Sequence, residues 1–141
     1  QKYIGGYHVK ILFGQTYRLL QQADAALVTS GTATLEAALF KVPQVVCYHL
    51  SPGKLISFIR RHVLKVRFIS LVNLIADREI VKELVADTMT VANVRTELRK
   101  LLFDEKKRHE MLDGYEYMAE RLGDPGAPHR AAVEMVKLLK K

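Results

Sequence analysis

The chain has 141 residues, and its 22 Lys and Arg against 15 Asp and Glu give a formal net charge of +7. Hydrophobic residues make up 49% of the chain and charged residues 26%, a balance that argues against disorder because it supplies a core. The longest uncharged stretches, 25–35 and 42–53, fall well short of the roughly 20 residues of a transmembrane helix. The single cysteine, Cys47, excludes a disulfide framework and a Cys-based zinc site, and it fits a reducing compartment.

Short apolar runs alternate with helical patterns in the first half of the chain. In chain order these patterns predict a strand at Val9–Phe13, a helix at Gln15–Gln22, a strand at Ala25–Val28, a helix at Thr32–Phe40, a strand at Gln44–Tyr48, a helix at Lys54–Val66 and a strand at Arg67–Leu71. Strands separated by helices of this length indicate βαβ units and a parallel sheet.

The second half reads as helices alone. Their predicted ranges are Arg78–Ala86, Val91–Leu102, Glu105–Arg121 and His129–Leu139. The predicted fold is therefore α/β, a partial doubly wound, Rossmann-like parallel sheet of three to four strands followed by C-terminal helices. Because so narrow a sheet would leave helices without a surface to cover, we expect further strands before residue 1.

The strongest site candidate is the turn from the strand at 25–28 into the next helix. Ligands of parallel sheets bind beyond the carboxyl ends of strands, where free N–H groups and the helix dipole favour an anion such as a diphosphate. Gly31 permits close approach of a ligand, and the hydroxyls of Ser30, Thr32 and Thr34 add donors. Glu36 lies on the same helix face as Thr32 and could accept from ribose hydroxyls, or it could simply be an acidic residue favoured by the dipole.

The segments Ser30–Leu39, Pro43–Tyr48, Asn73–Ala76 and Gly126–Ala132 resemble, in order and spacing, the lipid-A-disaccharide synthase family. The resemblance covers nearly the whole chain. The departures are Val72, Lys82, Ala86 and Pro128, which stand where the family usually has Pro, Pro, Gln and Ser.

The resemblance implies a glycosyltransferase of the two-domain GT-B architecture, which transfers 2,3-diacylglucosamine from UDP to 2,3-diacylglucosamine 1-phosphate. Residues 1–141 would be part of the C-terminal, UDP-sugar-binding domain, with a strand and helix core at about 8–77 and a helical tail at about 78–141. The N-terminal acceptor domain, which usually supplies the base, would lie outside it, so we expect no catalytic residue here and no activity from this chain alone. The implied location is the cytoplasmic face of the inner membrane of a Gram-negative bacterium, as a peripheral protein, and a homodimer is left open.

Glycosyl transfer needs stabilisation of the charge that develops on UDP, by a metal ion or by fixed dipoles. The chain has no Asp-x-Asp pair and no histidines at ligand spacing, so we expect no metal or other cofactor. Tyr48 would line the nucleotide cleft. Asn73 would contact a sugar or phosphate oxygen, although a turn or cap asparagine is the alternative.

A basic, apolar stretch carries Lys54, Arg60, Arg61, Lys65 and Arg67 between aliphatic residues. Such a segment can rest on an anionic membrane, or it can be the ordinary outer face of a helix that covers a sheet. No nucleic-acid motif accompanies the charge, so we do not expect a nucleic-acid partner. Two alternative functions stay open from the sequence: another UDP-sugar transferase or epimerase, and a non-catalytic module that binds anions or membranes.

Overall fold

A computed structural model describes residues 9–29, 31–48 and 67–139 of the chain. Its elements, in order, are α1 (Thr16–Leu20), β1 (Ala26–Val28), α2 (Gly31–Leu39), β2 (Gln44–Tyr48), α4 (Leu71–Ala76), β3 (Lys82–Val85), the short 3-10 helix η2 (Ala86–Thr88), α5 (Val91–Phe103), α6 (Glu105–Leu122) and α7 (Ala127–Leu139). The predicted α/β class is confirmed.

The strands form a parallel sheet in the order β1-β2-β3. Val46 of β2 pairs with Val28 of β1 on one side and with Glu83 of β3 on the other. The central strand is buried from Gln44 to Cys47, as expected for a strand of β-branched residues with neighbours on both sides.

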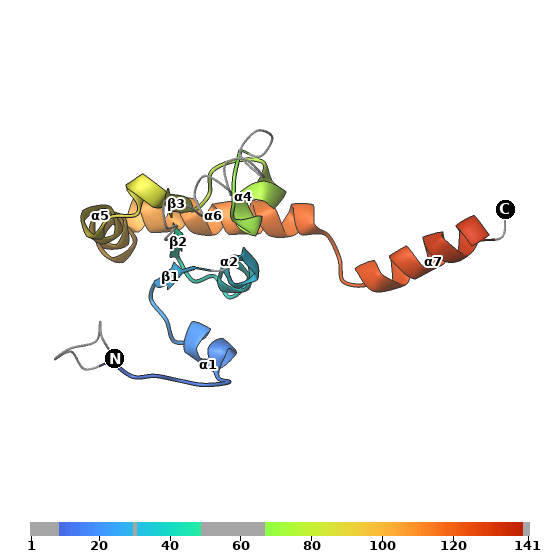
Figure 1. The fold of residues 1–141 in the computed structure, drawn as a ribbon, viewed down its shortest axis with the longest axis horizontal. Helices are drawn as coiled ribbons and strands as arrows, with labels where there is room; N and C mark the ends of the chain where they lie inside the picture. Colours follow the sequence, from blue (N-terminus) through green and yellow to red (C-terminus); the bar gives the residue numbers. More distant parts are fainter. Residues whose placement is uncertain (1–8, 30, 49–66, 140–141) are drawn as a thin grey trace.

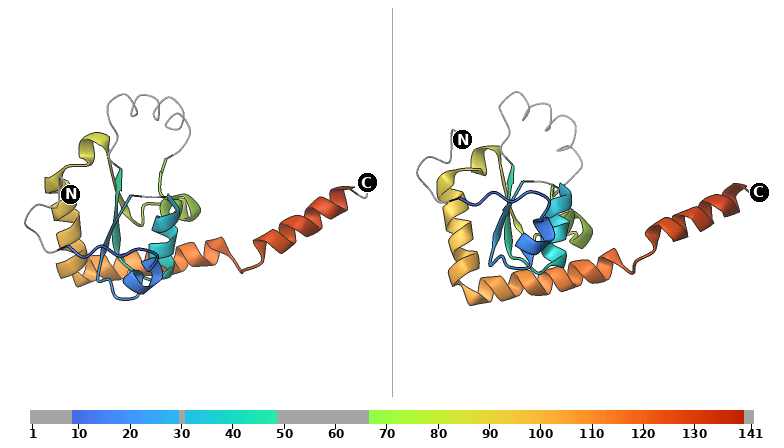
Figure 2. Two further views of the ribbon diagram at one scale, coloured as in Figure 1. Left: turned by 60° about the horizontal axis from the view of Figure 1, so that its bottom comes forward. Right: turned by 90° about the horizontal axis from the view of Figure 1, so that it is seen from below.

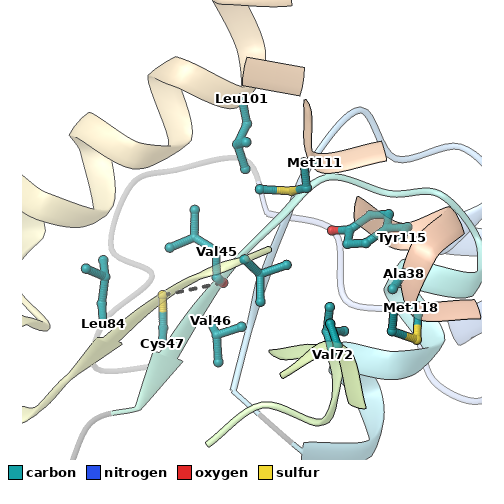
Figure 3. Close-up of a cluster of buried hydrophobic side chains, with 12 residues drawn as sticks. Ala38, Val45, Val46, Cys47, Val72, Leu84, Leu101, Met111, Tyr115 and Met118 are labelled. Carbon is teal, nitrogen blue, oxygen red and sulfur yellow. Dashed lines mark hydrogen bonds between the residues drawn. The ribbon is translucent and has the colours of Figure 1, made fainter. Parts of the chain in front are cut away.

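Helices cover both faces of this sheet: α2 and α4 pack on one face and α5 on the other (Figure 1). The core between the sheet and these helices consists of apolar side chains from both the strands and the helices. Figure 3 shows Tyr115, Ala38 and Met118 beside one another, and Cys47 next to Leu84 of the neighbouring strand. The two-sided cover explains why β2 has almost no polar residue.

The long helix α6 crosses the amino-terminal end of the sheet (Figure 2). The Arg108 guanidinium donates to the carbonyl of Asp24, just before β1, at 2.7 Å. The Tyr115 hydroxyl donates to the carbonyl of Val42, just before β2, at 3.1 Å, and the backbone N–H of Gln44 contacts the Met111 sulfur at 3.3 Å. Because α6 closes the amino end, the carboxyl end of the sheet is the edge left for a ligand.

The C-terminal helix α7 extends away from the rest of the molecule (Figures 1 and 2). Its side chains from Pro128 to Leu139 are all exposed. Within the described ranges, no helix combines the length and the apolar character needed to cross a membrane.

Three sequence predictions of local structure are wrong. The segment 78–86 was predicted to be helical, but it contains β3, because Val81 and Leu84 are buried at the edge of the sheet. The predicted strand at Arg67–Leu71 ends instead in the N-cap of α4, where the Ser70 hydroxyl accepts from the backbone N–H of Asn73. The predicted strand at Val9–Phe13 has no strand structure, since no neighbour pairs with it among the described residues.

The other predicted elements that can be compared are confirmed, most of them within a residue or two at each end. The predicted helix at Lys54–Val66 lies outside the described residues. The strand-bearing part of the chain reaches Val85, beyond the expected limit near residue 77.

Candidate functional site

The carboxyl ends of the three parallel strands, at Val28, Tyr48 and Val85, lie at one edge of the sheet. The helix α2 begins beyond this edge at Gly31, and α4 begins at Leu71 after the connection that leaves β2. The topology therefore brings Gly31, Thr32 and Tyr48 to the same edge. Ser30 lies outside the described residues.

The described residues leave space at the N-terminal turn of α2. Apart from the chain neighbours of Gly31 and the backbone of its own helix, no described atom lies within 4 Å of the position that a Cβ on Gly31 would occupy, and the Thr32 side chain is exposed. Thr34 differs from these two residues because it is fully buried and its hydroxyl donates to the Gly31 carbonyl at 2.5 Å. The free N–H groups at this turn carry the positive end of the helix dipole, which favours an anion.

Glu36, one turn further along α2, lines a hollow of about 400 Å³. The remaining lining comes from the first residues of α1 and the turn before them: Gly14, Gln15, Thr16, Tyr17 and Arg18. Tyr17 stacks on Phe40 with ring centroids 5.3 Å apart, so an aromatic contact fixes α1 against the end of α2. The hollow offers a carboxylate, a guanidinium and hydroxyls within the same small volume.

The segment 14–18 was not among the site residues predicted from the sequence. A glycine followed by polar residues at the start of a helix was visible there, as it was at 30–32. Gly14 has a φ of 65°, in the left-handed region that glycine adopts at little cost. What the sequence could not show was that α1 packs beside α2 and faces Glu36.

Tyr48 is half-buried at the end of β2. Burial raises the pKa of its phenol above the ordinary value, and the nearby negative charge of Glu83 raises it further. The hydroxyl therefore stays neutral across the physiological range and can both donate and accept a hydrogen bond.

Asn73 is completely buried in the first turn of α4. Its side-chain amide donates to the Val81 carbonyl at 2.9 Å and to a Glu83 carboxylate oxygen at 2.8 Å. Its side-chain oxygen accepts from the N–H groups of Ile80 at 2.7 Å and Val81 at 3.0 Å. A direct contact between this amide and a ligand stays a prediction, and the ligand would have to compete with these bonds.

Four of the predicted membrane residues, Lys54, Arg60, Arg61 and Lys65, lie outside the described residues. Arg67 is exposed, with its guanidinium carbon 5.1 Å from the centre of the Phe68 ring. Within the described ranges, no group of three or more His, Cys, Asp or Glu side chains is placed to hold a metal ion.

A larger hollow, of about 540 Å³, lies between α5, α6 and the residues before β3. Its charges occur largely as ion pairs, which join Lys82 to Glu79, Lys100 to Glu97 and Lys107 to Glu110. Paired charges leave little net attraction for a charged ligand. The smaller hollow beside α2 is the better candidate because Glu36, which lines it, lies one helical turn from the N-terminus of α2 at the carboxyl edge.

A parallel sheet with helices on both faces, and an open helix N-terminus beyond its carboxyl edge, places the chain among Rossmann-like α/β proteins. The family model described as lipid-A-disaccharide synthetase matches residues 5–132. The chain belongs to this family.

Curated relatives agree with the family match. The chain is 42% identical over 127 residues to a lipid-A-disaccharide synthase of Myxococcus xanthus, 36% identical over 133 residues to one of Syntrophus aciditrophicus, and 44% identical over 115 residues to one of Psychromonas ingrahamii. These alignments cover 89%, 94% and 82% of the chain, but only 32%, 34% and 29% of the respective relatives. The chain thus spans about a third of the length of these relatives.

Proposed function

We propose that this chain supplies the UDP-sugar-binding part of a glycosyltransferase that joins 2,3-diacylglucosamine, released from UDP, to 2,3-diacylglucosamine 1-phosphate. The observation that carries the proposal is the position of Glu36, which lines a hollow and lies one helical turn from the N-terminus of α2. The relatives named above are lipid-A-disaccharide synthases, and the similarity to them covers the residues of this site.

In this proposal each part of the donor meets a different group. The diphosphate lies at the N-terminal turn of α2, where the N–H groups of Gly31 and Thr32 and the helix dipole stabilise its charge as the sugar departs. Glu36 accepts from the ribose hydroxyls, and the nucleoside occupies the hollow beside α1. Tyr48, at the end of β2, contacts the donor from the same edge of the sheet as the N-terminal turn of α2. The dipole and the N–H groups take the part that a metal ion plays in other glycosyltransferases, so we propose that no metal is required.

Calorimetric titration of UDP into the protein tests this assignment. Replacement of Glu36 by Ala should weaken binding by roughly 1–3 kcal/mol, the cost of losing a charged hydrogen-bond acceptor, which corresponds to a factor of about 5 to 150. Glu120→Ala is the matched control because Glu120 is exposed on α6 and is not among the residues that line the hollow. An unchanged affinity for Glu36→Ala would remove Glu36 from the site.

The acceptor and the catalytic base belong, in this proposal, to sequence outside the 141 residues. The chain alone should therefore bind UDP without forming disaccharide. Measurable turnover by the purified chain would contradict that division of labour.

We also propose that the protein works at the surface of the inner membrane, since acylated sugars partition into bilayers. The support is the basic, apolar stretch that includes Arg67. Cosedimentation with phosphatidylglycerol vesicles, but not with phosphatidylcholine vesicles, would agree with this location. Equal binding to both, or to neither, would speak against it.

A further inference from the structure

Among the described residues, the carboxylate of Glu83 is held by neutral donors. One oxygen accepts from the backbone N–H of Ile69 at 2.9 Å. The other accepts from the backbone N–H of Ser70 at 3.0 Å, from the Ser70 hydroxyl at 2.7 Å and from the Asn73 amide at 2.8 Å. No ion pair joins Glu83 to a cation within the part of the chain that the structure describes.

These bonds join two parts of the fold that are separate in sequence, β3 and the stretch from Ile69 to Asn73 at the start of α4. Glu83 lies on β3, Ile69 lies in the segment before α4, and Asn73 lies in the first turn of α4. Asn73 extends the connection because its side-chain oxygen accepts from the N–H groups of Ile80 and Val81, immediately before β3. The Ser70 hydroxyl, which donates to Glu83, also caps α4 at 3.3 Å from the Asn73 nitrogen.

We propose that Glu83 is a positioning residue of the nucleotide-sugar site, a role that rests on the function proposed above. The connection that leaves the site at Tyr48, at the end of β2, returns to the fold at Ser70, where α4 begins. Glu83 fastens this returning end to the strand that pairs directly with β2. It thereby fixes the start of α4 relative to Tyr48 without touching the ligand.

The direction in which Glu83→Gln changes the affinity for UDP tests this proposal. A carboxylate near a diphosphate repels it, so a Glu83 that acted only through its charge would weaken UDP binding, and Glu83→Gln would strengthen it. If Glu83 instead positions the site, Glu83→Gln should weaken UDP binding. The glutamine amide cannot accept from both groups of donors, so at least one part-buried donor loses its partner and the segment 69–73 loosens.

The experiment compares UDP affinity and backbone hydrogen exchange in Glu83→Gln and in the unaltered protein. We expect the dissociation constant for UDP to rise about 5- to 20-fold, and the amides of Ile69 and Ser70 to exchange about tenfold faster or more. Glu79→Gln is the matched control, because Glu79 pairs with Lys82 at an exposed site by the other hollow, and both quantities should stay unchanged there. If Glu83→Gln does not fold, Ser70→Ala, which removes one bond to Glu83 and the cap of α4, should give the same two changes at smaller size.

The outcomes separate this proposal from the proposed function. Loss of affinity in Glu36→Ala together with unchanged or tighter binding in folded Glu83→Gln would overturn the positioning role and leave the proposed function standing. Faster exchange at Ile69 and Ser70 with unchanged UDP affinity would make Glu83 a residue of stability alone, and would also overturn it. Absence of UDP binding by the unaltered protein would overturn the proposed function and the positioning role together.

Discussion

Gly114, in the middle of α6, lies directly against the segment that leads into β3. A Cβ at this position would lie 2.6 Å from Cγ2 of Ile80, 3.1 Å from its Cγ1 and 3.3 Å from its Cβ. At a distance of 2.6 Å, either the Ile80 side chain or the helix must move, and the branched Ile80 side chain has few alternative rotamers. We therefore expect Gly114→Ala to push α6 away from the start of β3.

The magnitude follows from two opposing effects. Overpacking of a core contact typically costs about 1–3 kcal/mol, whereas alanine in place of glycine inside a helix contributes up to about 1 kcal/mol. The free energy of unfolding should therefore fall by roughly 1–2 kcal/mol in Gly114→Ala. In an Ile80→Ala background the two closest atoms are absent, so the same change should instead stabilise the chain by up to about 1 kcal/mol.

Urea denaturation of the four proteins in this double-mutant cycle measures both effects and their coupling. Gly31→Ala is a control, because no described atom outside its chain neighbours and its own helix backbone lies within 4 Å of the added methyl group. A Gly114→Ala protein as stable as its parent, or one equally destabilised in both backgrounds, would refute the packing argument.

Three further predictions concern single positions. Ala86, just after β3, has a φ of 48°, so Ala86→Gly should raise the free energy of unfolding by roughly 0.5–1 kcal/mol in urea denaturation, and a decrease would show that the left-handed turn is not strained. Tyr115→Phe should lower the free energy of unfolding by roughly 1–2 kcal/mol, because the buried Val42 carbonyl loses its donor at 3.1 Å. An unchanged free energy of unfolding would mean that this bond is replaceable. Burial also raises the pKa of Tyr115 far above its ordinary value. The unfolded chain therefore loses this proton first, so the stability that Tyr115 contributes is complete below about pH 10 and falls as the pH rises further, with a slope of up to about 1.4 kcal/mol per pH unit. Between pH 9 and 11, the free energy of unfolding should fall less steeply with pH in Tyr115→Phe than in the unaltered protein. The same slope in both proteins would contradict this prediction.

The sequence alone determined the elements whose information is local. β2 was predictable because a run of mostly apolar residues, with the β-branched Val45 and Val46 at its centre, follows Pro43. The helices α5 and α6 were predictable from their periodicity, and the structure adds their N-caps at Thr90 and Asp104. The turn at Gly31 and the acid at Glu36 were also visible in the sequence as a possible anion and ribose site.

Tertiary structure alone decided the features that depend on partners distant in the chain. β3 is a strand because β2 lies beside it and α6 covers its start, although its charged residues favoured a helix locally. The hollow at Glu36 exists because α1 packs on α2, and Asn73 and Glu83 meet only because α4 lies against the start of β3. A periodic pattern reports which face of an element is buried, whereas the neighbour that buries it is chosen by the free energy of the whole packed core.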